Sequence, residues 1–397
     1  MKRAVSDSIY YVGASDRRLA LFENTFPLPN GVSYNSYLID SDRTALTDTV
    51  DRSVADVFFD NLAEALGSKP LDYLVVHHVE PDHAATVADL LLRYPDVKIV
   101  TSAKALVLLN RFNDADYTAR TIVVKEGDTL DLGKHTLRFV AAPMVHWPEV
   151  FVSYETATKT LFSADAFGTF GALGGNLFAD EIDFDRDIKD EMRRYFINIV
   201  GKYGVQVQNL LKKAASLEIA AICPLHGPIW RKDLGKVIAL HDTWSAYRPE
   251  DQSVVIACAS IYGNTARAAD YLADRLAERG IKGIRIYDVS KTHVSYVVAE
   301  AFRASHVVFA APTYNNGIFI EMEHLLHDLV AHNFRNRRFA LIENGSWAPQ
   351  SGKLMQSMLS ALPGVTQIGE TVTVCSALNA DARRALDCLA EAVASEF

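Results

Sequence analysis

The sequence predicts an α/β protein of two domains, the second of them a doubly wound parallel sheet. The chain has 397 residues, 49% of them hydrophobic, and beyond roughly 250 to 300 residues a single core usually splits. From Ala45 to about Cys223, apolar strand-like runs alternate with helical patterns and polar turns, as α/β layers do. A polar segment with a central proline, residues 246–253, then precedes a new strand. We therefore expect domains at residues 1–250 and 251–397.

The order of elements after this linker indicates the doubly wound sheet. Strand-like and helical patterns alternate strictly, and Gly280 marks a helix end. The expected elements are a strand at Val254–Ala259, a helix at Thr265–Arg279, a strand at Ile284–Val289, a helix at Val298–Arg303, and strands at His306–Ala311 and Phe339–Glu343.

Composition and charge exclude several function classes. A formal net charge of -9 argues against binding to a nucleic-acid backbone. Residues 1–13 lack the apolar region of a signal peptide, and no apolar run is long enough to span a membrane. We therefore expect a cytoplasmic protein. Its cysteines lie far apart without a Cys-x-x-Cys pair, and we expect buried, reduced thiols at Cys223, Cys258, Cys375 and Cys388.

Potential metal ligands crowd residues 73–83, where a buried-type strand breaks into a loop. His78 and Glu80 are two residues apart, so an extended chain points both side chains toward one ion. Asp82 and His83 follow a proline and can turn toward a second ion. Another histidine precedes His78, and we expect it on the opposite face of the strand.

Three further candidates follow apolar runs elsewhere in this half. Taken alone, a histidine or aspartate after a strand is commonly a turn former or a helix cap. Loops at the carboxyl ends of strands gather at one edge of an α/β sheet, so seven candidates on four loops, without a thiolate, favour a metal site. His146 ends the run 137–145, Asp165 ends 160–164, and His226 follows 219–224. The other eight of the 12 histidines receive no role.

This motif resembles the His-x-His-x-Asp-His of the metallo-β-lactamase superfamily, with Glu80 in place of the second histidine. That replacement marks flavodiiron proteins, and the segments His146-Trp-Pro-Glu149 and Ser163-Ala-Asp-Ala-Phe167 match them too. The resemblance implies a metallo-β-lactamase-like αββα sandwich over residues 1–250. It also implies two irons, one held by His78, Glu80 and His146, the other by Asp82, His83 and His226, with Asp165 bridging.

The carboxylates of this set favour redox chemistry. Three of them contribute about three negative charges against the four of two Fe(II) ions, which helps the pair toward Fe(III). A zinc hydrolase needs no such oxidation. Glu80 therefore points from hydrolysis toward reduction, although manganese or zinc occupancy stays open. The family places no nucleophilic side chain in the reaction path.

Three loops in the second half predict a phosphate-bearing cofactor. The first joins a strand to a helix N-terminus, where hydroxyls and backbone N–H groups can hold a phosphomonoester without a lysine. Such a turn alone is often only a cap. The loops are Ser260, Ile261, Tyr262, Gly263, Asn264 and Thr265; Pro312, Thr313, Tyr314, Asn315, Asn316 and Gly317; and Asn344, Gly345, Ser346 and Trp347.

Together these loops resemble the FMN-binding loops of flavodoxins, and more closely those of flavodiiron proteins. The resemblance implies a flavodoxin-like fold over residues 251–397 that binds FMN rather than FAD. The third loop departs from the family pattern, because Gly345 stands where a tyrosine is usual. Trp347 keeps the tryptophan position, where it either packs on the isoalloxazine or is an ordinary loop residue covering the sheet edge.

The leading hypothesis is a terminal oxidoreductase. Electrons enter at FMN, pass to the irons, and reduce O2 to water, NO to N2O, or both. The alternatives are a metallo-β-lactamase-fold hydrolase with an accessory flavodoxin domain, and a flavin electron carrier or gas sensor with a structural metal. The resemblance implies the two-domain form without an appended rubredoxin or flavin-reductase module. It also implies a rubredoxin-like or other external donor, and a head-to-tail homodimer or dimer of dimers.

One basic cluster has no place in this scheme. Arg335, Arg337 and Arg338 lie just before the strand that leads to the third loop. They either steer an acidic electron carrier toward FMN or form an ordinary solvated loop face.

Overall fold

The computed structural model describes residues 3–397, which fold as two compact units. Unit 1 extends to Asp242 and unit 2 begins at Thr243. The division falls near the end of helix α7 (Leu234–Ser245), ahead of the predicted boundary at residue 250. Among the described residues, no helix combines the length and the apolar character that a membrane span requires.

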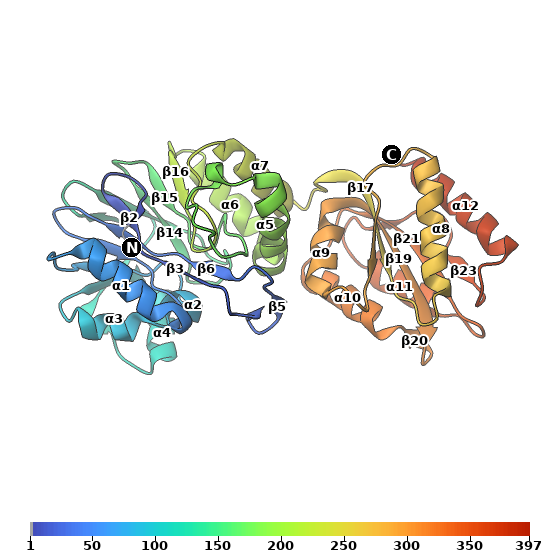
Figure 1. The fold of residues 1–397 in the computed structure, drawn as a ribbon, viewed down its shortest axis with the longest axis horizontal. Coiled ribbons are helices and arrows are strands. Elements are labelled where there is room, and N and C mark those ends of the chain that lie inside the picture. Colours follow the sequence, from blue (N-terminus) through green and yellow to red (C-terminus); the bar gives the residue numbers. More distant parts are fainter. Residues whose placement is uncertain (1–2) are drawn as a thin grey trace. The chain divides into compact units, whose positions relative to one another are not determined.

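Unit 1 is a sandwich of two sheets with helices on both outer sides (Figure 1). In the first sheet, β8, β9, β10 and β11 are parallel and the remaining pairs are antiparallel. Its strands, in sheet order, are β1 (Arg3–Ala4), β2 (Ile9–Tyr11), β7 (Tyr37–Ile39), β8 (Ala45–Thr47), β9 (Tyr73–Val75), β10 (Lys98–Ser102) and β11 (Thr121–Val124).

The second sheet faces the first across an apolar core. Phe139, Phe151 and Phe162 from the second sheet pack in one buried cluster with Val75 and Val100 from the first. Dispersion and the removal of this apolar surface from water hold the layers together. Its strands, in sheet order, are β12 (Thr129–Asp131), β13 (Thr136–Ala141), β14 (Phe151–Glu155), β15 (Thr160–Phe162) and β16 (Ala221–Cys223).

Helices and two small antiparallel strand pairs complete unit 1. Figure 1 shows α1, α3 and α4 on one side of the sheets and α5, α6 and α7 on the other. Small antiparallel pairs join β3 (Ala14–Asp16) to β6 (Val32–Tyr34) and β4 (Leu21–Phe22) to β5 (Phe26–Pro27). The helices before α7 are α1 (Ala55–Leu66), α2 (Pro81–Ala84), α3 (Val87–Arg93), α4 (Ala103–Asn113), α5 (Lys189–Tyr195) and α6 (Gly204–Ala214).

Unit 2 is the doubly wound sheet that the sequence predicts. The main strands are parallel in the order β18, β17, β19, β21, β22, which is the flavodoxin-like order 2-1-3-4-5. They are β17 (Asp251–Cys258), β18 (Arg285–Asp288), β19 (Ala304–Tyr314), β21 (Arg338–Asn344) and β22 (Thr366–Gln367), with β20 (Gly317–Ile318) paired to β19 and β23 (Val372–Val374) paired to β21.

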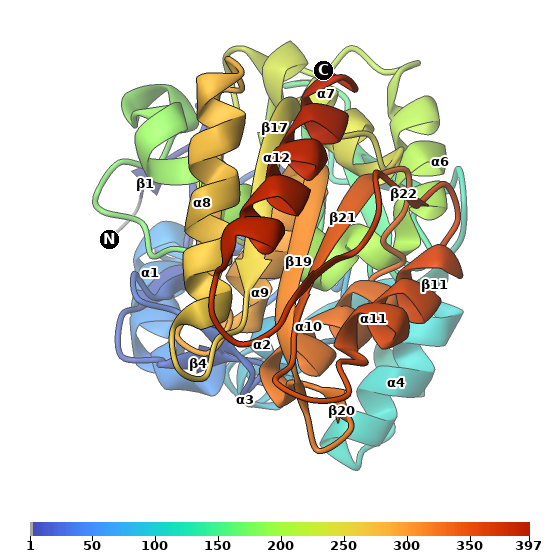
Figure 2. The same ribbon diagram turned by 90° about the vertical axis from the view of Figure 1, so that its right-hand side faces the viewer.

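Helices cover both faces of this sheet (Figure 2). α8 and α12 lie together over one face, where Ala268, Leu272 and Leu386 join a core with Ile256 and Ile342 of the strands. The helix predicted at 298–303 is longer than expected. It begins at Val294, and the side chain of His293 caps its N-terminus. The helices are α8 (Asn264–Glu278), α9 (Val294–Arg303), α10 (Ile320–Ala331), α11 (Ser351–Ser360) and α12 (Ala380–Ala394).

The expectation of four buried thiols is half wrong. Cys223 and Cys258 are buried in strands, and burial raises the pKa of the Cys258 thiol to about 12. Cys375 and Cys388 are exposed. Cys388 lies on the solvent-facing side of α12, and Cys375 lies just after the short strand β23. The nearest apolar neighbour of each cysteine in the sequence is buried, whereas the cysteine itself is exposed.

Candidate functional site

The seven predicted ligands lie in two adjoining groups at one edge of unit 1. They come from the loop after β9 and the short helix α2 that follows it, from the loop between β13 and β14, and from the loops after β15 and β16. β13, β15 and β16 run in the same direction, so their carboxyl ends share an edge. Within each group the possible ligand atoms lie within 4.8 Å of one another. The first group is His78, Glu80, His146 and Asp165, and the second is Asp82, His83 and His226.

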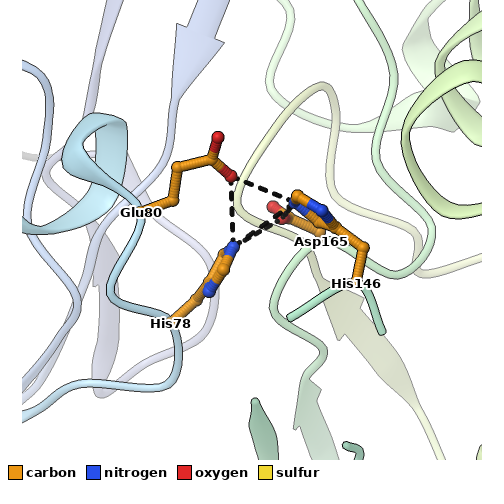
Figure 3. Close-up of side chains that lie close together, drawn as sticks. All are labelled: His78, Glu80, His146 and Asp165. Carbon is orange, nitrogen blue, oxygen red and sulfur yellow. Dashed lines mark hydrogen bonds and ion pairs between the residues drawn. The ribbon is translucent and has the colours of Figure 1, made fainter. Parts of the chain in front are cut away.

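In the first group, four side chains converge on a small space (Figure 3). Glu80 Oε2 lies 3.2 Å from His78 Nε2 and 3.0 Å from His146 Nε2. Asp165 Oδ2 lies 3.3 Å and 3.1 Å from the same two nitrogens. Two imidazole nitrogens and two carboxylate oxygens therefore face a common centre, which is a suitable donor set for a first-row metal ion.

The second group meets the other oxygen of Asp165. Asp165 Oδ1 lies 3.2 Å from His83 Nε2 and 3.7 Å from His226 Nε2. Asp82 Oδ2 lies 3.3 Å and 3.2 Å from these nitrogens. One carboxylate thus offers one oxygen to each group, as a ligand that bridges two ions does.

The polar atoms of the cluster fit a cation better than they fit each other. Within the described chain, both carboxylate oxygens of Asp82 and Asp165 and both ring nitrogens of His83 are buried without a hydrogen-bond partner. Buried polar atoms are almost always paired, and each unpaired one costs about 1–3 kcal/mol. Short distances between carboxylate oxygens and imidazole nitrogens that do not form hydrogen bonds are expected where these atoms are arranged to bind a metal ion.

The electrostatics of the cluster agree with this conclusion. Burial opposes the change, but hydrogen bonds with His146 and His78 lower the pKa of Glu80. Burial likewise disfavours the charged form of His146, yet Asp165 and Glu80 outweigh it and raise its pKa to about 9. Although burial opposes it, neighbouring carboxylates raise the pKa values of His78 and His83 as well, so without metal these three imidazoles favour their protonated forms. Metal binding therefore releases protons.

The sequence analysis missed Glu149 and Tyr195, which lie beside the candidate ligands. Glu149 Oε1 accepts a hydrogen bond of 2.7 Å from His78 Nδ1, which leaves Nε2 for a metal. Tyr195, the last residue of α5, places its ring 5.5 Å from that of His226. Burial raises the pKa of the Tyr195 hydroxyl well above 10, so the group stays protonated. Glu149 lies three residues after the candidate ligand His146, and this proximity could have indicated that it belongs to the site. No residue near Tyr195 in the sequence indicates its place beside the site.

His77 takes the structural place expected for it. Its Nδ1 lies 2.6 Å from Asp48 Oδ2 and its Nε2 lies 2.8 Å from Ser153 Oγ. Its ring packs against Phe151 and Phe162 of the core. His77 therefore braces the strand end from the face opposite to its neighbour His78.

Unit 2 carries a pocket of about 290 Å³ at the carboxyl edge of its parallel strands. All three predicted loops line it, and a fourth segment, after β23, adds Ser376. Ser376 was missed because only its pairing with the third loop, through hydrogen bonds to Asn344 and Ser346, brings it to the pocket. The lining residues are Ser260, Ile261, Tyr262, Asn264, Thr265, Pro312, Thr313, Asn315, Asn316, Asn344, Gly345, Ser346, Trp347 and Ser376.

The inner end of this pocket suits a phosphate. α8 begins there after Gly263, whose φ of 89° favours glycine, and its N-terminus has no side-chain cap. Uncapped N–H groups and the helix dipole attract an anion. Of the predicted loop residues, Tyr314 and Gly317 instead pair across the β19–β20 hairpin.

The hypothesis that the three arginines steer a carrier toward the pocket is not supported. Arg337 is 2% exposed and donates hydrogen bonds to the carbonyls of Tyr247 and Phe302. The cluster lies at the amino end of β21, whereas the pocket lies at the carboxyl end. Arg337 ties chain segments together inside unit 2, a role that its position before a strand did not reveal.

Fold and site define a protein with a metallo-β-lactamase-like unit, which carries two adjoining candidate metal-binding groups, and a flavodoxin-like unit. The family model described as "ODP family beta lactamase" matches residues 32–227. Anaerobic nitric oxide reductase flavorubredoxin of Escherichia coli O1:K1 / APEC is 30% identical over 354 residues, which are 88% of this chain and 73% of that protein.

Two solved structures share the whole fold. Rubredoxin oxygen:oxidoreductase from Desulfovibrio gigas superposes with a TM-score of 0.93 at 27% identity, over 100% of this chain and 98% of that one. The flavodiiron protein from Giardia intestinalis superposes with a TM-score of 0.89 at 25% identity, over 100% and 97%. The chain therefore belongs to the flavodiiron protein family, whose named relatives here are oxidoreductases.

Proposed function

We propose that this protein is an oxygen or nitric oxide reductase that holds two irons in unit 1 and FMN in unit 2. The observation that carries the proposal is the single carboxylate of Asp165, which faces the imidazoles of both ligand groups. In this proposal His78, Glu80 and His146 hold one iron, and Asp82, His83 and His226 hold the other. When bound, the irons supply electrons to O2 or NO. The protein supplies ligand geometry and a largely buried site.

The cofactor pocket is proposed to hold FMN through its phosphate. The hydroxyls of Ser260 and Thr265 and the N-terminus of α8 line the phosphate end. Tyr262 and Trp347 stand at the rim, 92% and 82% exposed, where they can cover an isoalloxazine ring. No lysine or arginine is among the pocket's lining residues, so neutral dipoles carry the recognition.

Metal and flavin analysis, followed by rapid kinetics, tests this function. Protein made under iron-replete conditions should contain about two irons and one FMN per chain. Reduced protein mixed anaerobically with O2 or with NO in a stopped-flow instrument should then be reoxidised, and the two rates give the substrate preference. Zinc without iron, or FAD in place of FMN, contradicts the proposal, and a thiol-ester or phosphodiester assay would then test the hydrolase alternative.

We further propose that electrons arrive from a rubredoxin-like carrier and cross between chains in a head-to-tail homodimer or dimer of dimers. The exposed aromatic rim of the flavin pocket is typical of a surface that another protein covers. A cytoplasmic location stays a prediction from the sequence.

A mixed dimer tests the crossing between chains. One chain carries His146→Ala with His226→Ala, which removes iron, and the other carries Thr265→Asp, which weakens FMN binding so that FMN is lost when no free flavin is added. Each homodimer should be inactive. The heterodimer keeps one intact FMN on the first chain and one intact iron pair on the second, so activity should return. A verified heterodimer that retains both cofactors and stays inactive contradicts the arrangement.

A further inference from the structure

The two halves of the metal centre differ in the groups behind their histidines. The carboxylate of Glu149 accepts hydrogen bonds from His78 Nδ1 at 2.7 Å and from the backbone N–H of Val79 at 3.2 Å. In the other half, His226 Nδ1 meets a neutral group, the carbonyl oxygen of Ser33, at 2.7 Å. His83 Nδ1 is buried, and the described chain offers it no hydrogen-bond partner.

Glu149 is placed for this contact by the same turn that carries His146. The turn joins β13 to β14, and Ser102 Oγ donates a hydrogen bond of 3.1 Å to the backbone carbonyl of Glu149. The Glu149 side chain is fully buried. Trp147, between the two residues, packs edge-on against the rings of His78 and His146. One turn therefore supplies a ligand and also fixes the orientation of a second ligand.

A buried carboxylate on the outer nitrogen makes an imidazole a stronger donor to a metal. The hydrogen bond fixes the tautomer with Nε2 free, and the negative charge raises the electron density of the ring. Such outer partners typically change metal affinity about 10- to 100-fold. In the half with His78, a carboxylate therefore accepts the hydrogen bond from the outer nitrogen of a candidate ligand. In the other half, His226 Nδ1 meets a neutral carbonyl and His83 Nδ1 has no partner within the described chain.

We propose that Glu149 is a positioning residue that makes the His78 half the tighter metal site and the half in which Fe(III) is preferred. Metal fills this half first, and the half with His83 and His226 fills second. The inference rests on the proposed function in that the cluster binds two metal ions and, for the Fe(III) preference, in that these ions are iron.

Titration of the metal-free protein with Co(II), whose visible spectrum reports its ligands, separates the two sites. Wild type should bind in two steps. Glu149→Gln keeps the shape and an acceptor oxygen but removes the charge, so the tighter step should weaken about 10- to 100-fold while the weaker step changes little. Failure of the wild type to bind two metal ions contradicts the proposed function and is a result distinct from an unchanged Glu149→Gln titration.

Two half-site backgrounds assign the steps. With His226→Ala, the remaining tight step should weaken when Glu149→Gln is added. With His146→Ala, adding Glu149→Gln should change the remaining step less than about twofold, well below the range expected of a ligand partner. Equal weakening in both backgrounds, or no weakening in either, overturns the proposal.

Glu155→Gln is the matched control. Glu155 is also fully buried, accepts hydrogen bonds from the backbone N–H groups of Ala157 and Thr158, and lies 3.0 Å from a histidine, His135. It stands outside the metal cluster. Its neutralisation should affect folding stability and leave both Co(II) steps unchanged.

The reduction potential gives a second measurement. In the iron-loaded protein, loss of the Glu149 charge destabilises Fe(III), so the midpoint potential should rise in Glu149→Gln and stay near wild type in Glu149→Asp, which keeps the charge. If Glu149→Gln does not fold, the Co(II) binding of Glu149→Asp decides instead. Its shorter side chain should then weaken the tight step alone, and an unchanged titration contradicts the role of Glu149.

Discussion

The candidate metal centre of unit 1 is built from charged, buried residues, whereas the pocket of unit 2 is lined by uncharged residues and is open to solvent. The metal centre gathers three carboxylates and four imidazoles in a space where each residue is less than 10% exposed. The pocket is open, its rim aromatics are exposed, and its lining residues are all uncharged. Both sites stand at carboxyl ends of strands, so the same edge of an α/β layer serves both kinds of chemistry.

This difference in charge determines what stabilises the arrangement of side chains in each site. Buried carboxylates repel one another unless cations compensate them, so the proposed centre relies on bound metal and on hydrogen-bond partners of its candidate ligands. Glu149 accepts a hydrogen bond from His78 Nδ1, and Asp48 accepts one from the backbone N–H of His78. The pocket needs no compensation, because it is built from hydroxyls, amides and a helix N-terminus. Substitutions that change the charge of the centre in unit 1 should therefore strongly affect metal binding. In unit 2, substitutions that change the shape of the pocket or add a charge to it should affect FMN binding.

The largest effect is expected from Asp165→Ala. Because one carboxylate faces both ligand groups, its loss should weaken the binding of both metal ions by more than about 100-fold, beyond the effect of an outer partner. Flavin content should stay at one per chain. Elemental and flavin analysis measure both, with the exposed Asp56→Ala of α1 as the control. Retention of two metals would show that Asp165 is not the bridge.

Thr265→Asp should have the opposite selectivity, because it should weaken FMN binding in unit 2 and leave metal binding in unit 1 unchanged. A carboxylate at the N-terminus of α8 repels the phosphate, so the Kd for FMN should rise about 100-fold, or about 2.7 kcal/mol, with the metal content unchanged.

Thr265→Val removes only the hydroxyl and should raise the Kd about tenfold. Flavin fluorescence titration gives these constants, and Ser290→Asp, exposed after β18, is the control. Equal FMN binding in Thr265→Asp and wild type would place the phosphate elsewhere.

Glu80→His tests whether charge in the metal centre serves redox chemistry. It replaces an anionic ligand that stabilises oxidised iron, so reductase turnover should fall at least about tenfold, or about 1.4 kcal/mol in the barrier. FMN should stay bound, because Glu80 belongs to unit 1. Turnover is compared only between samples of equal iron content. Unchanged turnover at full occupancy would show that the carboxylate is not needed.

The smallest effect is expected from Trp347→Ala. Trp347 is 82% exposed, so its removal should leave folding intact and cost only its packing on the flavin, about 0.5–1.5 kcal/mol or roughly a twofold to twelvefold rise in Kd. Tyr314→Ala, an exposed aromatic outside the pocket lining, is the matched control. No difference between the two variants would identify Trp347 as an ordinary loop residue.

Local pattern in the sequence was sufficient for much of the fold and for the residue types of both sites. The alternation of strands and helices after residue 250 predicted the order of unit 2, and the spacing of His78 and Glu80 predicted their common direction. These inferences succeed because strand periodicity and helix starts depend on neighbouring residues. The strand expected at 137–145 nevertheless ends at Ala141, and His146 lies in the following turn.

Tertiary structure alone decided which groups stand behind the ligands and which charges are buried. His78 and Glu149 are 71 positions apart, and the packing of two sheets brings them within 2.7 Å. Arg337 is buried because carbonyls from distant segments surround it, although its sequence neighbours suggested a solvated loop. Long-range contacts of this kind depend on how layers pack, which no local spacing encodes. The sequence therefore determined the types and the order of the candidate ligands, and the fold determined the different hydrogen-bond partners behind the two groups.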